Sequence, residues 1–225
     1  MTQFTFGRIE SPPDKRDHLM ASAVAAMPVQ PRVDKHWPAK AVLNQGPYPE
    51  CGGFSWAHWG ICAPVEQKWT NVMGRSIYKA CKQIDGSPNE DGTTLRAGAQ
   101  VMLKRERIAR YFWAHDVDEA LEYTSRYGPT VFGSPWTEGM CKPSMYNATI
   151  KATGKVVGGH AYLVCGVQWS KNRARIHQSW GIDWGDGGEC WISIPDLKAV
   201  YRDGGEACAA WERSMTTGGT DATTA

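Results

Sequence analysis

Cys51 is the residue of this sequence best placed for nucleophilic chemistry, because Gly52 and Gly53 follow it directly. A thiol attacks a carbonyl only as the thiolate, and the unpaired amides and dipole of a helix N-terminus stabilise that anion. Glycines have no side chains to obstruct a substrate that approaches the sulfur. Taken alone, however, a cysteine beside two glycines is more often a buried structural residue.

A helix that begins at Cys51 would give the thiol this position. Apolar residues recur from there at the spacing of one helical stripe, at Phe54, Ala57, Ile61, Cys62, Val65 and Trp69. Pro64 interrupts the stripe and should kink or end the helix near Ala63. The apolar pattern predicts further helices at 73–82, 94–105 and about 116–127. Local capping signals support two of these helices.

After residue 128 the apolar period becomes that of strands. Strands are predicted at 130–132, 161–169, 173–180 and 189–194, separated by glycine-rich turns. The fold class is therefore α+β, with a helical half at about 51–127 and a β half at about 128–211. A single domain is expected over 1–215, with the first 30 residues extended over the core and a flexible tail at 216–225.

Three segments, in order, carry a family resemblance. They are NQGPYPECGGFSWA around Cys51, GGHAYLVCGVQW beginning near His160, and HQSWGIDWGDGGECWI around Gln178. Together they resemble the nucleophile, histidine and Asn-Ser-Trp-Gly segments of the papain family of cysteine peptidases. The upstream RVDKHWPAKAVLNQG also resembles the family's entry strand. The resemblance implies a helical lobe and a β-barrel-like lobe, with segment 30–45 packing on the latter and the active site in the cleft between them.

The resemblance also implies roles for the matched residues. Cys51 would attack a peptide carbonyl, and His160 would act as the base, the two resting as a thiolate–imidazolium pair. Gln45 lies six residues before Cys51, and its amide would form the oxyanion hole together with the Cys51 backbone N–H. The expected substrate is a protein or peptide, and no cofactor is required.

Two positions depart from the family pattern. Gln178 stands where the family has an Asn that orients the histidine. A Gln amide can still accept the Nδ1 proton of His160, but with one more torsion to restrain, so Gln178→Asn is expected to raise turnover. Tyr48 stands where members commonly have a disulfide-forming Cys, and its presence agrees with a reducing compartment.

Several residues are expected to line the cleft. YKACKQIDGSPNEDGTTLRAG resembles a loop that holds substrate backbone in this family, which would place Gly92 and Thr93 there. Trp136 and Gly159 are candidates for pocket walls. The resemblance further implies that Trp180 shields the contact between the histidine and its orienting residue from water.

Other polar residues have simpler interpretations. His58 lies about two helical turns from Cys51, too far to share its proton, and is expected to be structural. His177 precedes Gln178, and neighbouring strand residues point to opposite faces, so only one of them can face the cleft. Gln178 is preferred over His177 as the residue that faces the cleft. Asp183, Asp186 and Glu189 lack the ligand spacing of a calcium loop and predict a tight turn.

The composition of the chain argues against several classes of binding partner. A net charge of +2 predicts no strong field, and nucleic-acid binding is not expected. The densest basic run, 104–110, is interpreted as the solvated face of a helix. No apolar run approaches the roughly 18 residues of a membrane span, and no signal peptide is apparent, so a cytoplasmic or virion-associated protein is expected. Seven cysteines without a CxxC pair are interpreted as free thiols, with no metal site.

Two rival functions remain open. A family member that has lost activity could serve as a binding or structural module, for example in a phage particle, and Gln178 favours that reading. A cell-wall amidase or acyltransferase could use the same Cys-His pair with a variable third residue. The organisation resembles that of short bacterial and phage members, in which autoinhibition by a long propeptide is not expected.

Overall fold

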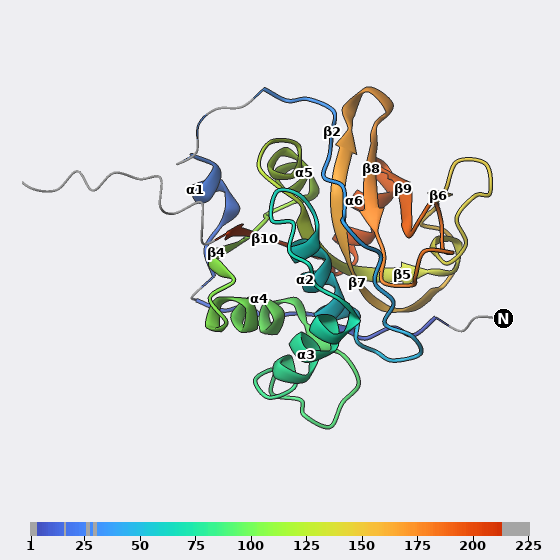
Figure 1. The fold of residues 1–225 in the computed structure, drawn as a ribbon. Helices are drawn as coiled ribbons and strands as arrows, with labels where there is room; N and C mark the ends of the chain where they lie inside the picture. The colour runs from blue at the N-terminus through green and yellow to red at the C-terminus, as the bar shows by residue number, and fades with distance from the viewer. Residues whose placement is uncertain (1–3, 16, 26–27, 29–30, 213–225) are drawn as a thin grey trace, which may run out of the picture.

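The computed structural model describes residues 4–15, 17–25, 28 and 31–212, so the tail predicted at 216–225 lies outside the described residues. Helix α2 (Cys51–Ile61) lies between the other helices of its lobe and a large sheet (Figure 1). All eleven of its residues are buried, because it is covered on both sides rather than along one stripe. Cys62 is already extended, so the helix ends before Pro64.

Local capping residues begin the helices that accompany α2. Thr70 caps α3 (Asn71–Cys81), and Thr94 accepts a hydrogen bond from the Ala97 amide at the start of α4 (Leu95–Lys104). Asp116 accepts one from the Glu119 amide at the start of α5 (Val117–Arg126). Each cap satisfies an amide that has no partner inside its own helix.

Seven strands form the path of the main sheet in the order β4-β10-β5-β7-β8-β9-β6, and β2 adds beside β7. Their bounds are β2 (Lys35–His36), β4 (Ile108–Trp113), β5 (Thr130–Thr137), β6 (Thr149–Ile150), β7 (Val156–Gln168), β8 (Arg173–His177), β9 (Glu189–Ser193) and β10 (Glu206–Glu212). The pairings are antiparallel except that of β6 with β9. Within the described residues the two end strands do not pair, so the β lobe is an open sheet and not a barrel.

Part of the expected helical half belongs to the sheet. Strand β4 pairs with β10, so the basic run at 104–110 ends in a strand and its interpretation as a helix face is wrong for 108–110. Helix α5 packs against β7. The pattern also gave no sign of the remaining elements, α1 (Met20–Ala25), α6 (Ile194–Arg202), β1 (Arg8–Ile9), β3 (Thr93–Thr94) and the short 3-10 turns η1 (Glu138–Met140) and η2 (Trp169–Lys171).

Strand β7 separates two apolar cores. Leu163 packs into the core that contains α2, whereas its neighbour Val164 packs into the core that contains α5 and α6. Successive strand residues point to opposite faces, so one strand contributes to both cores. No helix among the described residues is long and apolar enough to cross a membrane.

Candidate active site

The candidate nucleophile and base come from α2 and β7, which pack against each other. Cys51 is the first residue of α2, and His160 lies on β7; both are fully buried. A backbone hydrogen bond from Ala161, the residue after His160, reaches the Cys51 thiol. The fold thus brings the helix start and the histidine strand to one place.

Gln178 lies directly after β8 and contacts the histidine. Its Oε1 is 2.7 Å from His160 Nε2, and an amide oxygen only accepts, so Nε2 carries the proton. The expectation of an Nδ1 contact is therefore corrected. Nδ1 has no hydrogen-bond partner among the described residues, which leaves it available for the proton of a thiol. The backbone N–H of Gln178 donates a hydrogen bond to the Gly188 carbonyl at 2.9 Å.

Aromatic rings surround His160. Trp180 stacks on it with ring centroids 4.5 Å apart and planes 19° apart, so one face of the imidazole is covered by the indole. Trp136 meets the imidazole edge-on at 4.9 Å and is fully buried. Trp136 thus packs against the His160 ring with no exposed surface, and its place in a pocket wall stays a prediction.

Gln45 is fixed at both ends of its side-chain amide. Its Oε1 accepts a hydrogen bond from Ser179 Oγ at 2.6 Å, and its Nε2 donates to the carbonyl of Tyr48 at 2.7 Å. The same Nε2 also donates to the carbonyl of Thr5 at 3.1 Å. A peptide carbonyl of the N-terminal segment therefore already lies on the donor that the resemblance assigns to the oxyanion hole.

Residues 4–9, which we call the cleft segment, lie over the candidate active site. Strand β1 pairs in parallel with β3, and the Thr93 amide donates to the Gly7 carbonyl at 2.8 Å. A Cβ on Gly92 would lie 2.3 Å from the Gly7 carbonyl oxygen, so only glycine permits this approach. Thr93 thus binds extended backbone of the chain itself, and Gly92 allows its close approach; that either residue binds substrate stays a prediction.

The cleft segment also covers the rings and the sulfur. Phe6 meets His160 edge-on at 5.8 Å, and Phe4 stacks on Trp180 at 4.2 Å. A Cβ on Gly159 would lie 2.4 Å from the Arg8 carbonyl oxygen, which places this glycine against the segment. In Figure 1 the blue N-terminal chain crosses from the sheet side of the molecule to the helical side.

Burial sets the charge state of the pair. It raises the pKa of the Cys51 thiol to about 11 against opposing backbone hydrogen bonds. It lowers the pKa of His160 to about 4, although the Gln178 contact opposes the shift. With the cleft segment seated, the site is therefore a neutral thiol and a neutral imidazole at pH 7. The expected thiolate–imidazolium pair does not describe this occupied state.

The structure gives a packing reason for the two glycines that follow Cys51. A Cβ on Gly53 would lie 2.5 Å from the Gly74 carbonyl oxygen of α3, and one on Gly52 would lie 2.6 Å from the Thr93 methyl group. Both glycines therefore allow close packing against α3 and β3.

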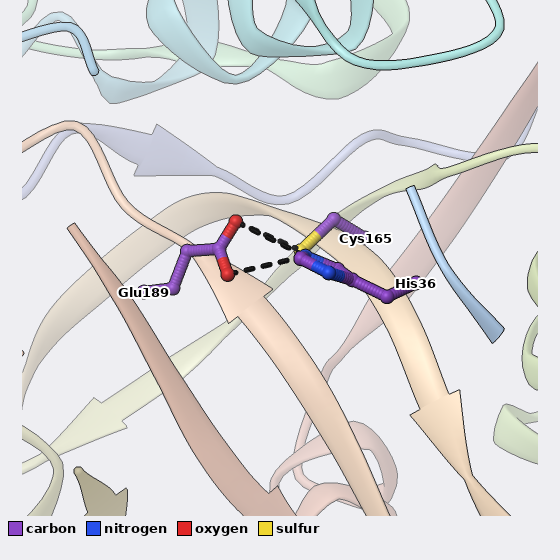
Figure 2. A group of neighbouring side chains, drawn as sticks. All are labelled: His36, Cys165 and Glu189. Atoms are coloured by element: carbon purple, nitrogen blue, oxygen red, sulfur yellow. Dashed lines mark hydrogen bonds and ion pairs between the residues drawn. The ribbon is translucent and has the colours of Figure 1, made fainter. Parts of the chain in front are cut away.

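His177 points away from the cleft into a polar cluster around Glu189. Its Nδ1 lies 3.1 Å from Glu189 Oε1, and its ring meets His58 edge-on at 4.3 Å. His58 accepts the Leu43 amide through Nε2, which agrees with a structural role. Figure 2 shows the Glu189 carboxylate facing the His36 ring and the Cys165 sulfur.

His36, Cys165 and Glu189 form the one group of three candidate metal ligands among the described residues, with ligand atoms within 4.8 Å of one another. Arg175 pairs with the same carboxylate, and its positive charge would oppose a bound cation. Burial raises the pKa of the Cys165 thiol well above its usual value, and Glu189 adds to the shift. The group is therefore best described as an ion-pair cluster that holds β7, β8 and β9 together.

Glu189→Gln is expected to lower the free energy of unfolding by about 3 kcal/mol at pH 7, since it leaves the Arg175 guanidinium without its buried partner. Burial opposes ionisation of Glu189, but hydrogen bonds from His177, His36 and Arg175 hold its pKa well below the usual value. The stability it supplies is thus present above about pH 4.5 and is lost as pH falls below that value.

Urea unfolding at several pH values would measure this loss. Glu66→Gln, in the exposed pair with Lys40, is the matched control and should cost under about 1 kcal/mol. A Glu189→Gln deficit that stays constant from pH 7 to pH 3 would contradict the assignment.

Sequence reasoning missed the residues that fill the cleft. Phe6, Gly7 and Arg8 lie in a stretch without a family-like motif. They are held by a backbone hydrogen bond to Gly7, a ring contact of Phe6 and an ion pair of Arg8, each with a partner far away in the sequence. Ser179, which orients Gln45, lies inside the third matched segment but drew no attention there. Glu206, the partner of Arg8, had no sequence signal.

No protein-family model and no curated protein matches the sequence. Solved structures match in fold. Xylellain, a cysteine protease from Xylella fastidiosa, has a TM-score of 0.70 at 20% identity, over 92% of this chain and 96% of its own. Procathepsin B S9 from Trypanosoma congolense has a TM-score of 0.67 at 13% identity, over 92% and 86%.

The bromelain protease from Ananas comosus, solved in complex with the E64 inhibitor, has a TM-score of 0.57 at 12% identity, over 81% of this chain and 100% of its own. At these identities the likeness concerns the arrangement of the elements and not individual residues. With its central helix α2 packed on an open, mainly antiparallel sheet, the chain has the fold of the papain-like cysteine proteases.

Proposed function

We propose that this chain is a cysteine peptidase that hydrolyses peptide bonds with Cys51 as nucleophile and His160 as base, and that the structure represents its latent form. The observation that carries the proposal is the Thr5 carbonyl, which accepts a hydrogen bond from Gln45 Nε2 at 3.1 Å. A donor aimed at a peptide carbonyl beside a thiol at a helix start is the arrangement that acyl transfer to sulfur requires.

The reaction follows from these groups once the cleft segment leaves. The Cys51 thiol gives its proton to His160 Nδ1, and the thiolate attacks the substrate carbonyl carbon. Gln45 Nε2 and the Cys51 backbone N–H stabilise the oxyanion. The imidazolium then protonates the leaving amine, which breaks the C–N bond and leaves a thioester. His160 removes a proton from water, which hydrolyses the thioester and restores the thiol.

Gln178 and Trp180 prepare the histidine for both proton transfers. Gln178 Oε1 accepts the proton on Nε2, so the tautomer with a free Nδ1 is maintained. The stacked Trp180 ring keeps water from competing for that hydrogen bond. The substrate backbone would take the strand position that β1 now holds beside β3.

The test is active-site labelling of the full chain with an epoxysuccinyl inhibitor, followed by peptide mapping with mass spectrometry. The Gly7→Ala variant, in which the cleft segment cannot seat as described, is labelled beside the wild type. We expect one adduct, on Cys51 and on none of the six other cysteines, and none on Cys51→Ser. No adduct on Cys51 in the opened variant would support the inactive-module alternative.

Substrate class is tested with the same opened variant. Release of peptides from denatured casein, absent in Cys51→Ser, is the expected result. Cleavage of peptidoglycan without cleavage of casein would instead support the cell-wall amidase alternative.

A further inference from the structure

A buried histidine of α2 binds the loop that carries Gln45. His58 lies about two turns after Cys51 on the same helix and is 1% exposed. Its Nε2 accepts a hydrogen bond from the Leu43 backbone N–H at 3.3 Å. Leu43 precedes Gln45 by two residues. A side chain of the helix that bears the nucleophile therefore holds the backbone of residues 43–45, which we call the oxyanion loop.

The oxyanion loop is held on a second side by the segment that follows Gln178. The Gln45 backbone N–H donates to the Ser179 carbonyl at 2.9 Å, and the Gly181 N–H donates to the Leu43 carbonyl at 3.2 Å. These bonds fix the loop relative to the residues that contact His160. The bond to His58 fixes the same loop relative to the helix of Cys51.

The His58 ring is in the one state that can accept this bond. A neutral imidazole accepts through one nitrogen and donates through the other, whereas an imidazolium only donates. The ring also hydrogen-bonds the Phe54 backbone, and since Nε2 accepts from Leu43, the donor to Phe54 is Nδ1. Burial lowers the pKa of His58 well below its usual value, and the neighbouring His177 adds to the shift. The acceptor is therefore present at pH 7.

The surroundings of His58 hold the ring in place and leave the Leu43 amide without a substitute partner. His177 packs edge-on against the ring with centroids 4.3 Å apart, and His177 is itself bound to Glu189 at 3.1 Å. Leu43 is 3% exposed, so water is a poor replacement acceptor for its N–H. A buried amide that loses its acceptor is costly, so the loop would shift if His58 were lost.

We propose that His58 is a positioning residue of the peptidase, which keeps Gln45 Nε2 and the Cys51 backbone N–H aimed at one oxygen by accepting the Leu43 amide. This proposal rests on the peptidase function proposed above. One donor belongs to α2 and the other to the oxyanion loop, so their separation depends on the link between helix and loop. Since negative charge develops on that oxygen only in the transition state, the link acts on kcat more than on substrate binding.

The test compares His58→Leu with His58→Gln, each in the full chain opened by Gly7→Ala. Leucine fills the site without an acceptor, whereas the glutamine Oε1 can accept the Leu43 amide. We expect His58→Leu to lower kcat about 10- to 100-fold and to change KM by less than about threefold, because a catalytic group misplaced by about 1 Å costs about this much. His58→Gln should retain kcat to within about fivefold.

Two further variants separate positioning from general damage to the fold. In a Gln45→Ala background, His58→Leu should change kcat by less than about twofold, because the donor that it positions is already gone. Tyr123→Phe, which removes a buried hydrogen bond to the Ala210 carbonyl, should leave kcat unchanged. An unchanged kcat in His58→Leu, or the same loss with and without the Gln45 side chain, would overturn the positioning role and leave the peptidase function standing.

The proton position on His58 is measured without any activity. Proton–nitrogen correlation spectra of the full chain with isotope-labelled histidine distinguish the two ring tautomers, and the signals lost in His58→Gln assign the ring. We expect the proton on Nδ1. A proton on Nε2 would overturn the positioning role, because that nitrogen could then not accept the Leu43 amide. The expected tautomer together with no peptide cleavage by Gly7→Ala would overturn the peptidase and retain the hydrogen bond.

Discussion

Substituting Gly7 by alanine is expected to raise the rate of peptide hydrolysis about 10- to 100-fold. A Cβ on Gly7 would lie 2.0 Å from the carbonyl oxygen of Pro49, a contact with backbone that cannot swing away. Overpacking of this kind costs about 1–3 kcal/mol, and each 1.4 kcal/mol changes the population of an open cleft about tenfold. The cleft segment should therefore unseat.

The pH dependence of Cys51 alkylation should also change in the Gly7→Ala variant. With the segment seated, burial holds its thiol pKa at about 11, so alkylation at pH 7 is slow and rises with pH. In Gly7→Ala the thiol gains solvent and the positive charge of a protonated His160, and both favour the thiolate. The alkylation profile should therefore move to lower pH.

Initial rates of iodoacetamide labelling at Cys51, followed by mass spectrometry from pH 5 to pH 10, measure this shift. Gly128→Ala is the matched control, because a Cβ there would make only ordinary contact, 3.6 Å from a Pro64 side-chain carbon. Equal rates in wild type, Gly7→Ala and Gly128→Ala would show that the segment does not limit access.

Substituting Gln178 by alanine in the opened Gly7→Ala background is expected to reduce kcat about 100-fold. The change removes the acceptor that lies 2.7 Å from His160 Nε2, so the ring loses its tautomer and its orientation. Misplacement of a catalytic group by about 1 Å can cost about this much.

Gln178→Asn should also lower kcat, by less than the alanine substitution. The sequence favoured the opposite expectation, since Asn is the family residue. In this fold, however, the longer side chain already reaches His160, and removing one methylene withdraws the oxygen by about 1.5 Å.

The pH profile of kcat/KM distinguishes orientation from structural damage. Loss of the Gln178 contact should lower the pKa of His160 further, because that contact is what opposes burial. Gln83→Asn, on the exposed surface after α3, is the control. An unchanged profile and an unchanged kcat in Gln178→Ala would remove Gln178 from the mechanism.

Elements defined by local signals were predictable from the sequence. The caps at Thr94 and Asp116 act on amides three residues away, so the information lies within one helical turn. Strands β4 and β10 were not predictable, because each is stabilised mainly by pairing with the other across nearly one hundred residues. A strand of this kind forms only when its partner strand is in place.

The candidate site also contains residues that the sequence predicts and residues that it does not. Gln45, Cys51, His160 and Gln178 come from segments with recognisable spacing, and the fold places them together. The choice between His177 and Gln178 followed from strand alternation, and His177 does face the opposite side, toward Glu189. The occupied cleft could not be predicted, since it depends on carbonyls of Thr5 and Gly7 that any sequence would supply.

Because the cleft segment belongs to the same chain as the candidate active site, it competes with substrate as an intramolecular ligand. Arg96 donates to the Pro12 carbonyl and pairs with Asp17, which tethers the chain only a few residues beyond Arg8. A short tether of this kind gives the segment an effective concentration of roughly millimolar order at the site. Its occupancy is therefore independent of protein concentration. Because the seated segment keeps the cleft closed by about 10- to 100-fold, a free peptide with the sequence of residues 4–9 should inhibit the opened enzyme at about 10 to 100 μM.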